Sequence, residues 1–244
     1  MSKSSQKTGK KTLKTGKTIS SIGTRKESSL HRSLKFHYSG KGGSVETTAG
    51  SFVCDACTSE GELVEVQTAS FGPLKEKAKS LCEKNKVKII HPVIAQKTIE
   101  LYDAGGERLI YRRKSPRKGS AWDLFNALIY APELAVQKNL TIELAVIDVI
   151  EKRVNDGAGS WRRKGVSITD RSLGAWHITV VLKCPKDYRQ FIPFRKAEAF
   201  TVHDLAAKAG IATAIARKTL YTLSKIGLVE KTGKQGNSLV YMRK

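Results

Sequence analysis

The sequence predicts a mixed α/β (α+β) fold, with a mixed sheet flanked by helices and a C-terminal helical unit that ends in a hairpin. Three observations support this prediction. Hydrophobic residues make up 40% of the 244 residues and charged residues 27%, a balance that allows a buried core. Segments of helical and of two-residue periodicity alternate along most of the chain. After residue 200 the spacing changes to helix, turn, helix and hairpin.

The first half of the chain predicts alternating helices and strands. Leu30 and Leu34 lie one helical turn apart, and Leu74, Ala78 and Leu81 repeat at helical spacing behind a proline. The expected elements are a helix at 27–36, antiparallel strands at 51–57 and 63–68, a helix at 74–82, a strand at 87–94 and a hairpin of 98–102 with 108–113. Pro92 predicts that its strand ends there or lies at an edge.

The second half is less regular until its last part. We expect a helix at 120–130 and a strand at 140–150, whereas 173–182 fits either a helix or a strand. Thr201 is a suitable cap for a helix at 202–209, and Gly210 a suitable turn before a helix at 212–226. A hairpin of 228–231 with 238–242 and a basic tip at 232–237 then ends the chain. This layout of helix, turn, helix and two-stranded wing resembles the winged-helix family.

Composition and these patterns divide the chain into three parts. Residues 1–22 carry six lysines and no acidic residue among Ser, Thr, Gly and Gln, and predict a disordered basic tail. Such a tail is either a solubilising arm or a phosphate-binding arm. The α/β unit is expected at 23–183, with a less certain middle region at 115–183, and the winged-helix unit at 184–244.

The charge balance indicates a polyanionic partner. The chain has 44 Lys and Arg against 22 Asp and Glu, a formal net charge of +22, so DNA is the expected partner. No run approaches the ~18 apolar residues of a membrane span, and the basic start has no apolar segment typical of a secretory signal. Four cysteines then predict reduced thiols and a cytoplasmic location. A homodimer is left open.

The hairpin at 51–68 carries the strongest chemical signal. If residues 59–61 form its loop with Gly61 at positive φ, the numbers of opposing residues sum to 120, and Asp55 lies across from Glu65. Strand alternation then places Gln67 on the same polar face. Two carboxylates at this distance repel unless a cation lies between them, and Mg²⁺ (or Mn²⁺) is the expected cation.

Asp55, a spacer of about ten residues and then Glu65-x-Gln67, followed by a helix, resembles the PD-(D/E)XK nuclease superfamily, with its restriction-endonuclease-like fold. The resemblance covers roughly residues 23–95. It implies that Asp55 and Glu65 hold the metal, that Gln67 orients a water in the position usually taken by Lys, that Glu27 is an additional catalytic acid and that Lys75 contacts phosphate. It implies a metal-dependent DNA endonuclease that hydrolyses phosphodiester bonds. Because an amide cannot act as a base, the alternative is a non-catalytic DNA-binding or regulatory protein on a degenerate nuclease scaffold.

Further residues are candidates for contacts with nucleic acid. In the C-terminal unit these are Thr213, Arg217, Lys218, Tyr221, Lys231, Lys234 and Gln235. Most suit phosphates, and Arg217 also suits a guanine edge. The alternative is a winged helix used for protein contacts. The basic loops at 115–119 and 161–164 either hold phosphates or are solvated. His31, one turn from Glu27, either joins the metal site or is a satisfied or exposed histidine.

Overall fold

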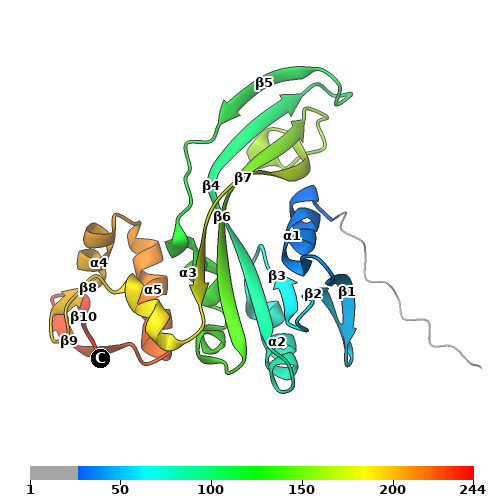
Figure 1. The fold of residues 1–244 in the computed structure, drawn as a ribbon. Coiled ribbons are helices and arrows are strands. Elements are labelled where there is room, and N and C mark those ends of the chain that lie inside the picture. Colours follow the sequence, from blue (N-terminus) through cyan, green and yellow to red (C-terminus); the bar gives the residue numbers. More distant parts are fainter. Residues whose placement is uncertain (1–26) are drawn as a thin grey trace, which may run out of the picture.

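A computed structural model describes residues 27–244 (Figure 1), so the predicted tail at 1–22 lies outside the described residues. Its main feature is a seven-stranded mixed sheet in the order β1-β2-β3-β4-β6-β7, with β5 paired to β4. β3, β4 and β6 run parallel, and the other pairs are antiparallel. The strands are β1 Ser44–Ala49, β2 Phe52–Cys57, β3 Leu63–Val66, β4 Val87–Tyr102, β5 Leu109–Lys114, β6 Leu140–Val154 and β7 Ser167–Leu182.

Helices cover both faces of this sheet, as the sequence predicts. The helix α1 (Ser29–Ser39) packs Leu30 and Leu34 onto one face, while α2 (Lys75–Cys82) and α3 (Leu124–Leu128) cover the other. Two separate apolar cores result because neighbouring strand residues alternate between the faces. Short 3-10 turns join these elements: Gly72–Leu74, Ala121–Asp123, Pro132–Val136, Trp161–Arg163 and Pro185–Phe191.

The structure contains one strand that the sequence did not predict and corrects the prediction for another. The polar segment of β1 was not predicted, and it pairs with β2 as the edge of the sheet. β4 continues through Pro92, where a strand end or an edge was expected. β3 ends opposite Ile90, so that side of β4 is unpaired at Pro92 until β5 begins to pair at Thr98. A proline, which has no N–H to donate, is therefore tolerated there.

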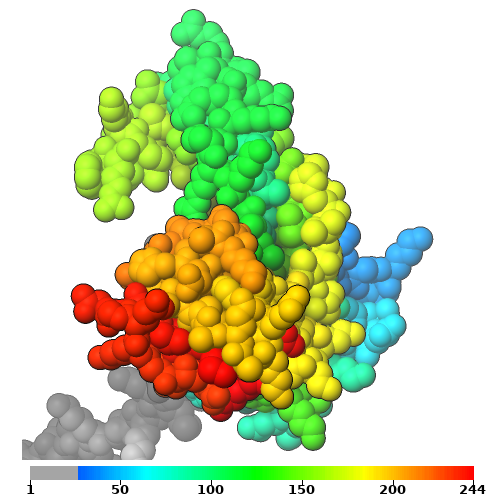
Figure 2. Space-filling view, turned by 90° about the vertical axis from the view of Figure 1, so that its left-hand side faces the viewer, coloured from blue at the N-terminus to red at the C-terminus, as the bar shows by residue number. Residues whose placement is uncertain are grey.

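The outer parts of β4, β6 and β7, together with β5, form a projection that we call the arm (residues 96–118 and 150–172). Figure 1 shows the arm extending beyond the helices, and Figure 2 shows it standing clear of the rest of the molecule. Every residue of β5 is exposed. At the base of the arm, Glu151 is buried and binds the side chains of Lys97, Arg153 and Arg171.

The C-terminal unit contains the predicted helix, turn, helix and hairpin, preceded by a short strand that the sequence did not predict. It consists of β8 (Ala199–Thr201), α4 (Val202–Ala209), α5 (Thr213–Lys225), β9 (Val229–Gln235) and β10 (Ser238–Arg243), with the sheet order β8-β10-β9. Thr201 caps α4 in a reciprocal pair of hydrogen bonds with Asp204, and Gly210 ends the helix at φ +63°. The apolar core beneath α2 and α3 continues into this unit, so the two parts are packed together. None of the helices in residues 27–244 is long and apolar enough to cross a membrane.

Candidate functional site

The predicted register of the β2–β3 hairpin is confirmed. Ala56 pairs with Val64 and Cys57 with Leu63, so the numbers of opposing residues sum to 120. The loop closes through a hydrogen bond from the N–H of Gly61 to the carbonyl of Thr58, and Gly61 has the expected positive φ of +80°. Asp55 and Glu65 therefore lie directly beyond the outermost pair of the two strands, Ala56 with Val64.

The prediction that Asp55 and Glu65 share one polar face is wrong. Asp55 contacts His31 and Lys35 of α1, whereas Glu65 pairs with Lys77 of α2. Since α1 and α2 cover opposite faces of the sheet, the two carboxylates turn away from each other.

The reason is an interruption of the alternation in β2. Cys54 packs into the core beside α2, yet Ala56, two residues later, packs into the core beside α1. In a regular strand these residues would share a face. Glu46, across from this point in β1, has a φ of +53°, a conformation that non-glycine residues rarely adopt. Both strands thus depart from regular geometry where Asp55 lies, and its carboxylate is turned toward α1.

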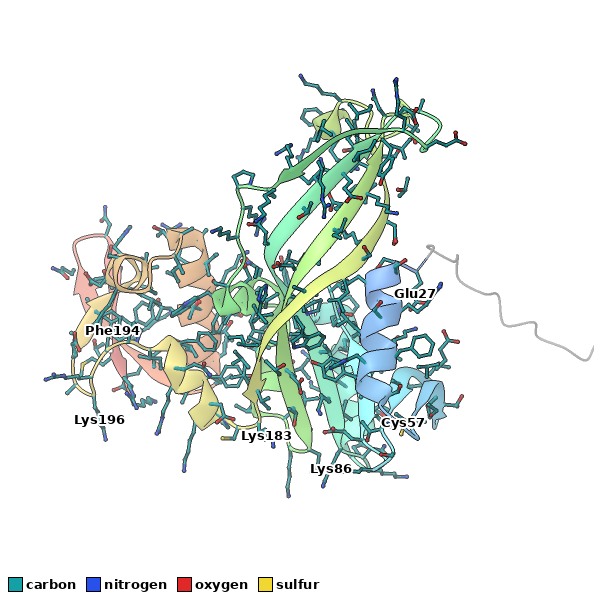
Figure 3. The ribbon with its side chains drawn as sticks, turned by 45° about the horizontal axis from the view of Figure 1, so that its top comes forward. Glu27, Cys57, Lys86, Lys183, Phe194 and Lys196 are labelled. Carbon is teal, nitrogen blue, oxygen red and sulfur yellow. The ribbon has the colours of Figure 1, made fainter. Side chains whose placement is uncertain are left out.

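Asp55 belongs to a group of four charged residues that we call the α1 cluster: Glu27, His31, Lys35 and Asp55. The ammonium of Lys35 lies 3.1 Å from Asp55 Oδ1 and 2.9 Å from Glu27 Oε1. His31 contacts Glu27 through Nδ1 at 2.7 Å and lies 3.5 Å from Asp55 through Nε2. Figure 3 shows Glu27 where the chain enters α1, at the end of the helix nearest the arm. The cluster contains two acids and two bases and is internally neutralised.

The pKa values of the α1 cluster reflect this pairing. The hydrogen bond with Asp55 raises the pKa of His31 to about 9, although burial opposes the increase. Burial alone would raise the pKa of Asp55, but the hydrogen bonds from His31 and from the backbone N–H of Val66 lower it to about 2. His31 is therefore an imidazolium at neutral pH, with both ring nitrogens donating, Nδ1 to Glu27 and Nε2 to the carbonyl of Val66.

On the opposite face, Glu65 is buried and bound to one lysine. Lys77 Nζ lies 2.6 Å from Glu65 Oε1 and also donates to the carbonyl of Val53. Burial raises the pKa of Glu65, and the contact with Lys77 opposes that increase. Gln67 donates through Nε2 to the carbonyl of Ser70. Its amide thus holds the following loop, and its predicted role in orienting a water remains a prediction.

These residues do not fit a joint Mg²⁺ site as they are arranged. A divalent cation needs carboxylate oxygens that converge, whereas Asp55 and Glu65 diverge and each is already paired with a cation. Within residues 27–244 no group of three or more His, Cys, Asp and Glu side chains has an arrangement that could hold a metal ion.

A basic groove of about 710 Å³ lies in the C-terminal unit between α5 and the β9–β10 hairpin. Arg217, Tyr221 and Lys225 line it from one exposed stripe of α5, because they are spaced four residues apart. Lys231 lines it from β9 and His203 from α4. Among the described residues that line the groove none is acidic.

The structure brings some of the predicted DNA contacts together and separates others. Arg217, Tyr221 and Lys231 line the groove, and Lys234 and Gln235 are exposed on β9 beside it. Thr213 is half-buried at the start of α5.

Two of the predicted phosphate contacts are occupied by other partners. Lys218, a predicted nucleic-acid contact, is half-buried, and its ammonium donates to Asn126 Oδ1 of α3 at 2.7 Å. Lys75 is bound to Glu133, so it is not a free cation either.

Sequence reasoning missed Lys35, Lys77 and Lys225. Glu27, His31 and Lys35 are spaced four residues apart, which places them on one face of α1. From that spacing the position of Lys35 beside Glu27 and His31 could have been predicted. The position of Lys77 beside Glu65 depends on the packing of α2 against the sheet, for which a single sequence carries no direct signal.

Comparisons with known proteins give a family but no activity. A family model described as "Domain of unknown function (DUF8091)" matches residues 28–183, which contain the large sheet and end just after β7. An uncharacterized protein of Treponema pallidum (strain Nichols) is 28% identical over 223 residues, which are 91% of this chain and 87% of that protein. No solved structure matches the chain. The similarity to the Treponema protein is longer than the region covered by the family model, and therefore extends beyond it.

Proposed function

The chain belongs to the DUF8091 family, a domain of unknown function, and we propose that this member is a DNA-binding protein of the cytoplasm. In this proposal the large sheet is a restriction-endonuclease-like scaffold and the C-terminal unit is a winged helix that docks on the duplex. The order of helices and strands supports these assignments, since each unit has the order that is typical of the family to which it is compared.

The observation that carries the proposal is the groove between α5 and the β9–β10 hairpin. Its charged lining residues are the bases Arg217, Lys225 and Lys231, and no described lining residue supplies a compensating carboxylate. Duplex DNA is a polyanion that such a surface attracts through its phosphates. The formal net charge of +22 adds a long-range attraction of the same sign.

The geometry of the groove favours contacts with the phosphate backbone of DNA over contacts that read its base sequence. In helix-turn-helix proteins the N-terminal part of the second helix enters the major groove. Arg217 lies in that part of α5, whereas Lys225 is near its end and Lys231 is on the hairpin. At those positions the two lysines are placed for phosphate contacts, which carry no sequence information. We therefore expect binding with little sequence preference, to which Arg217 is the best-placed contributor of a guanine contact.

Fluorescence anisotropy with a labelled duplex tests this proposal. Arg217→Ala and Lys231→Ala should each weaken binding several-fold at low salt. Lys138→Ala is the matched control, because Lys138 is an exposed lysine outside the groove. If all three variants bind like the wild type, the groove does not hold the duplex. If none of the proteins binds, the proposed function is wrong.

Metal-dependent hydrolysis of phosphodiester bonds is the second candidate function. The observation that favours it is that Asp55 Oδ2 accepts a hydrogen bond from the N–H of Val66, the residue directly after Glu65. The two acids are therefore close along the sheet even though their side chains diverge. Because the sheet lies between the two carboxylates, a joint site would require the β3 backbone to rotate so that Glu65 leaves Lys77 and reaches the α1 face. Asp55 and Glu65 would then be the residues that hold a Mg²⁺ ion, which would supply activation of a water. Glu27 lies in the same α1 cluster as Asp55.

Cleavage assays distinguish this second candidate from binding alone. Plasmid and single-stranded DNA are incubated with the protein in Mg²⁺, in Mn²⁺ and in EDTA. Hydrolysis predicts metal-dependent cleavage that is lost in both Asp55→Asn and Glu65→Gln, with duplex binding retained. DNA binding without cleavage under any of these conditions would support the non-catalytic alternative. Cleavage that survives both substitutions would place the activity elsewhere.

A further inference from the structure

The loop between β6 and β7 (residues 155–166), which we call the arm loop, is the strongest feature that the DNA-binding groove leaves unexplained. It lies at the end of the arm, beside the β4–β5 turn, where Gly106 approaches Val154. Figure 2 shows the yellow-green segment that contains it as a separate lobe beside the projecting strands. The arm loop carries the basic run Arg162, Arg163 and Lys164 directly after Trp161.

The arm loop has a defined structure. The N–H of Gly159 donates to the carbonyl of Gly165 at 2.7 Å, and the N–H of Val166 donates to the carbonyl of Arg163 at 3.1 Å. Arg163 Nε also donates to the carbonyl of Val166. A side chain at Gly159 would place its Cβ 1.9 Å from the Val166 carbonyl oxygen, so this close approach of two backbone segments requires glycine.

The arm loop exposes one large aromatic side chain, Trp161, to solvent. Trp161 is 81% exposed, the highest value among the exposed large hydrophobic residues. The guanidinium of Arg162 lies 5.5 Å from the centre of the indole ring. Arg162 and Lys164 are themselves exposed. An exposed indole is costly in water, and a partner that covers its face would recover the free energy of its burial.

The charge of the arm identifies the kind of partner. Residues 96–118 and 150–172 contain 13 Lys and Arg against 6 Asp and Glu. Of these acids, Glu151 is buried among three cations and adds no negative charge to the surface. An anionic partner with flat apolar faces fits both the excess of basic side chains and the exposed indole. Nucleic acid has this combination of phosphates and bases.

We propose that the arm loop is a second nucleic-acid contact, in which Trp161 stacks on an unpaired base while Arg162 and Lys164 contact the adjoining phosphates. The base must be unpaired because bases inside a duplex are already stacked on their neighbours and present only their edges. This inference rests on the proposed DNA binding and adds the class of substrate: a duplex that continues into a single strand. The groove holds the duplex, and the arm loop holds the single-stranded extension.

The test compares two labelled probes, a blunt duplex and the same duplex with a single-stranded 3′ extension. The variants are Trp161→Ala and, as a control that keeps an aromatic ring, Trp161→Phe. Stacking on aromatic side chains predicts that the wild type binds the extended probe about 5- to 100-fold more tightly than the blunt one. Trp161→Ala should remove this preference and leave the affinity for the blunt duplex within about twofold. Trp161→Phe should retain most of the preference.

Intrinsic fluorescence gives an independent readout, because stacking on a base quenches indole emission. The extended probe should quench the wild type, and the extra quenching should disappear in Trp161→Ala. Equal affinity of the wild type for the two probes, or an unchanged preference in Trp161→Ala, would overturn the inference about the arm loop while leaving duplex binding intact. A wild type that binds neither probe would overturn both proposals. Self-association in sedimentation that Trp161→Ala abolishes, without any preference for the extended probe, would show that a second copy covers Trp161 instead.

Discussion

Asp55 Oδ2 accepts a hydrogen bond from the backbone N–H of Val66 at 2.8 Å. A side chain of β2 thus bonds to the backbone of β3 just beyond the last regular pair of the two strands. The carbonyl of the same Val66 lies 3.1 Å from Nε2 of His31. One residue of β3 therefore connects an acid of β2 with a cation of α1, and the α1 cluster holds these three elements together.

The stability of the protein should decrease as the pH rises through the pKa of His31. Its pKa is raised from 6.5 to about 9 in the folded state. Its contribution is therefore fully present below pH 6.5 and is lost as the pH rises through 9. Chemical denaturation at pH 6 and pH 9.5 should show a loss on the order of 2 kcal/mol from this group. The His31→Gln variant should show a correspondingly flatter dependence.

His203→Gln is the control for that experiment, because His203 is exposed on α4. Its pH dependence should match that of the wild type. A wild type and a His31→Gln variant with parallel pH profiles would contradict the assignment of an imidazolium to His31.

Lys77 and Glu65 should be energetically coupled. Lys77→Met leaves the buried carboxylate of Glu65 without its cation and should cost about 2–4 kcal/mol of unfolding free energy at pH 7. Burial already raises the pKa of Glu65, so in this variant the acid should be protonated more readily, and the loss should be smaller at pH 5 than at pH 7. The double variant with Glu65→Gln should be more stable than Lys77→Met alone.

The neighbouring Lys79→Met is the matched substitution on the same helix. Lys79 makes more exposed contacts, with Glu76 and Glu133, and its removal should change stability by less than about 1 kcal/mol. If the effects of Lys77→Met and Glu65→Gln are additive in denaturation experiments, the two side chains do not interact as the structure shows.

Glu151 should make a large contribution to the stability of the base of the arm. Its side chain is bound by Lys97, Arg153 and Arg171. Glu151→Gln leaves these three cations close together without a counter-charge and should cost about 2–4 kcal/mol. Although burial opposes the change, these cations lower the pKa of Glu151 from 4.5 to about 2. The stabilisation is therefore present above pH 4.5 and is lost as the pH falls through 2.

Hydrogen exchange of the arm strands checks the prediction for Glu151, since local opening should be faster in Glu151→Gln. Glu107→Gln, in the exposed β4–β5 turn, should exchange like the wild type. Equal protection in both variants would show that Glu151 does not hold the arm strands together.

The fold was predictable where local chemistry decides it. Gly61 determines the hairpin loop, and with it the register that pairs Ala56 with Val64 and Cys57 with Leu63. Thr201 and Gly210 mark the ends of α4 because a cap and a left-handed glycine act within one helical turn. These signals need no knowledge of distant residues.

The parts that the sequence did not predict depend on distant contacts. The direction of Asp55 follows from its cationic partners on α1 and from the irregular geometry beside Glu46, so strict strand alternation led to the wrong face. On α5 alone Lys218 is on the outer face of the helix, but its ammonium donates to Asn126, 92 positions earlier in the chain.

Duplex binding by the C-terminal groove is the central claim, and its salt dependence tests it most directly. The affinity of the full chain for a short duplex is measured from about 50 to 300 mM KCl, in the wild type and in the double variant Arg217→Ala/Lys231→Ala. Each phosphate contact contributes about −0.9 to the slope of log affinity against log salt. We predict a wild-type slope of about −3 or steeper, and a slope about 1.8 units shallower in the double variant. Equal slopes in the two proteins, or no binding by the wild type at the lowest salt, would contradict the account.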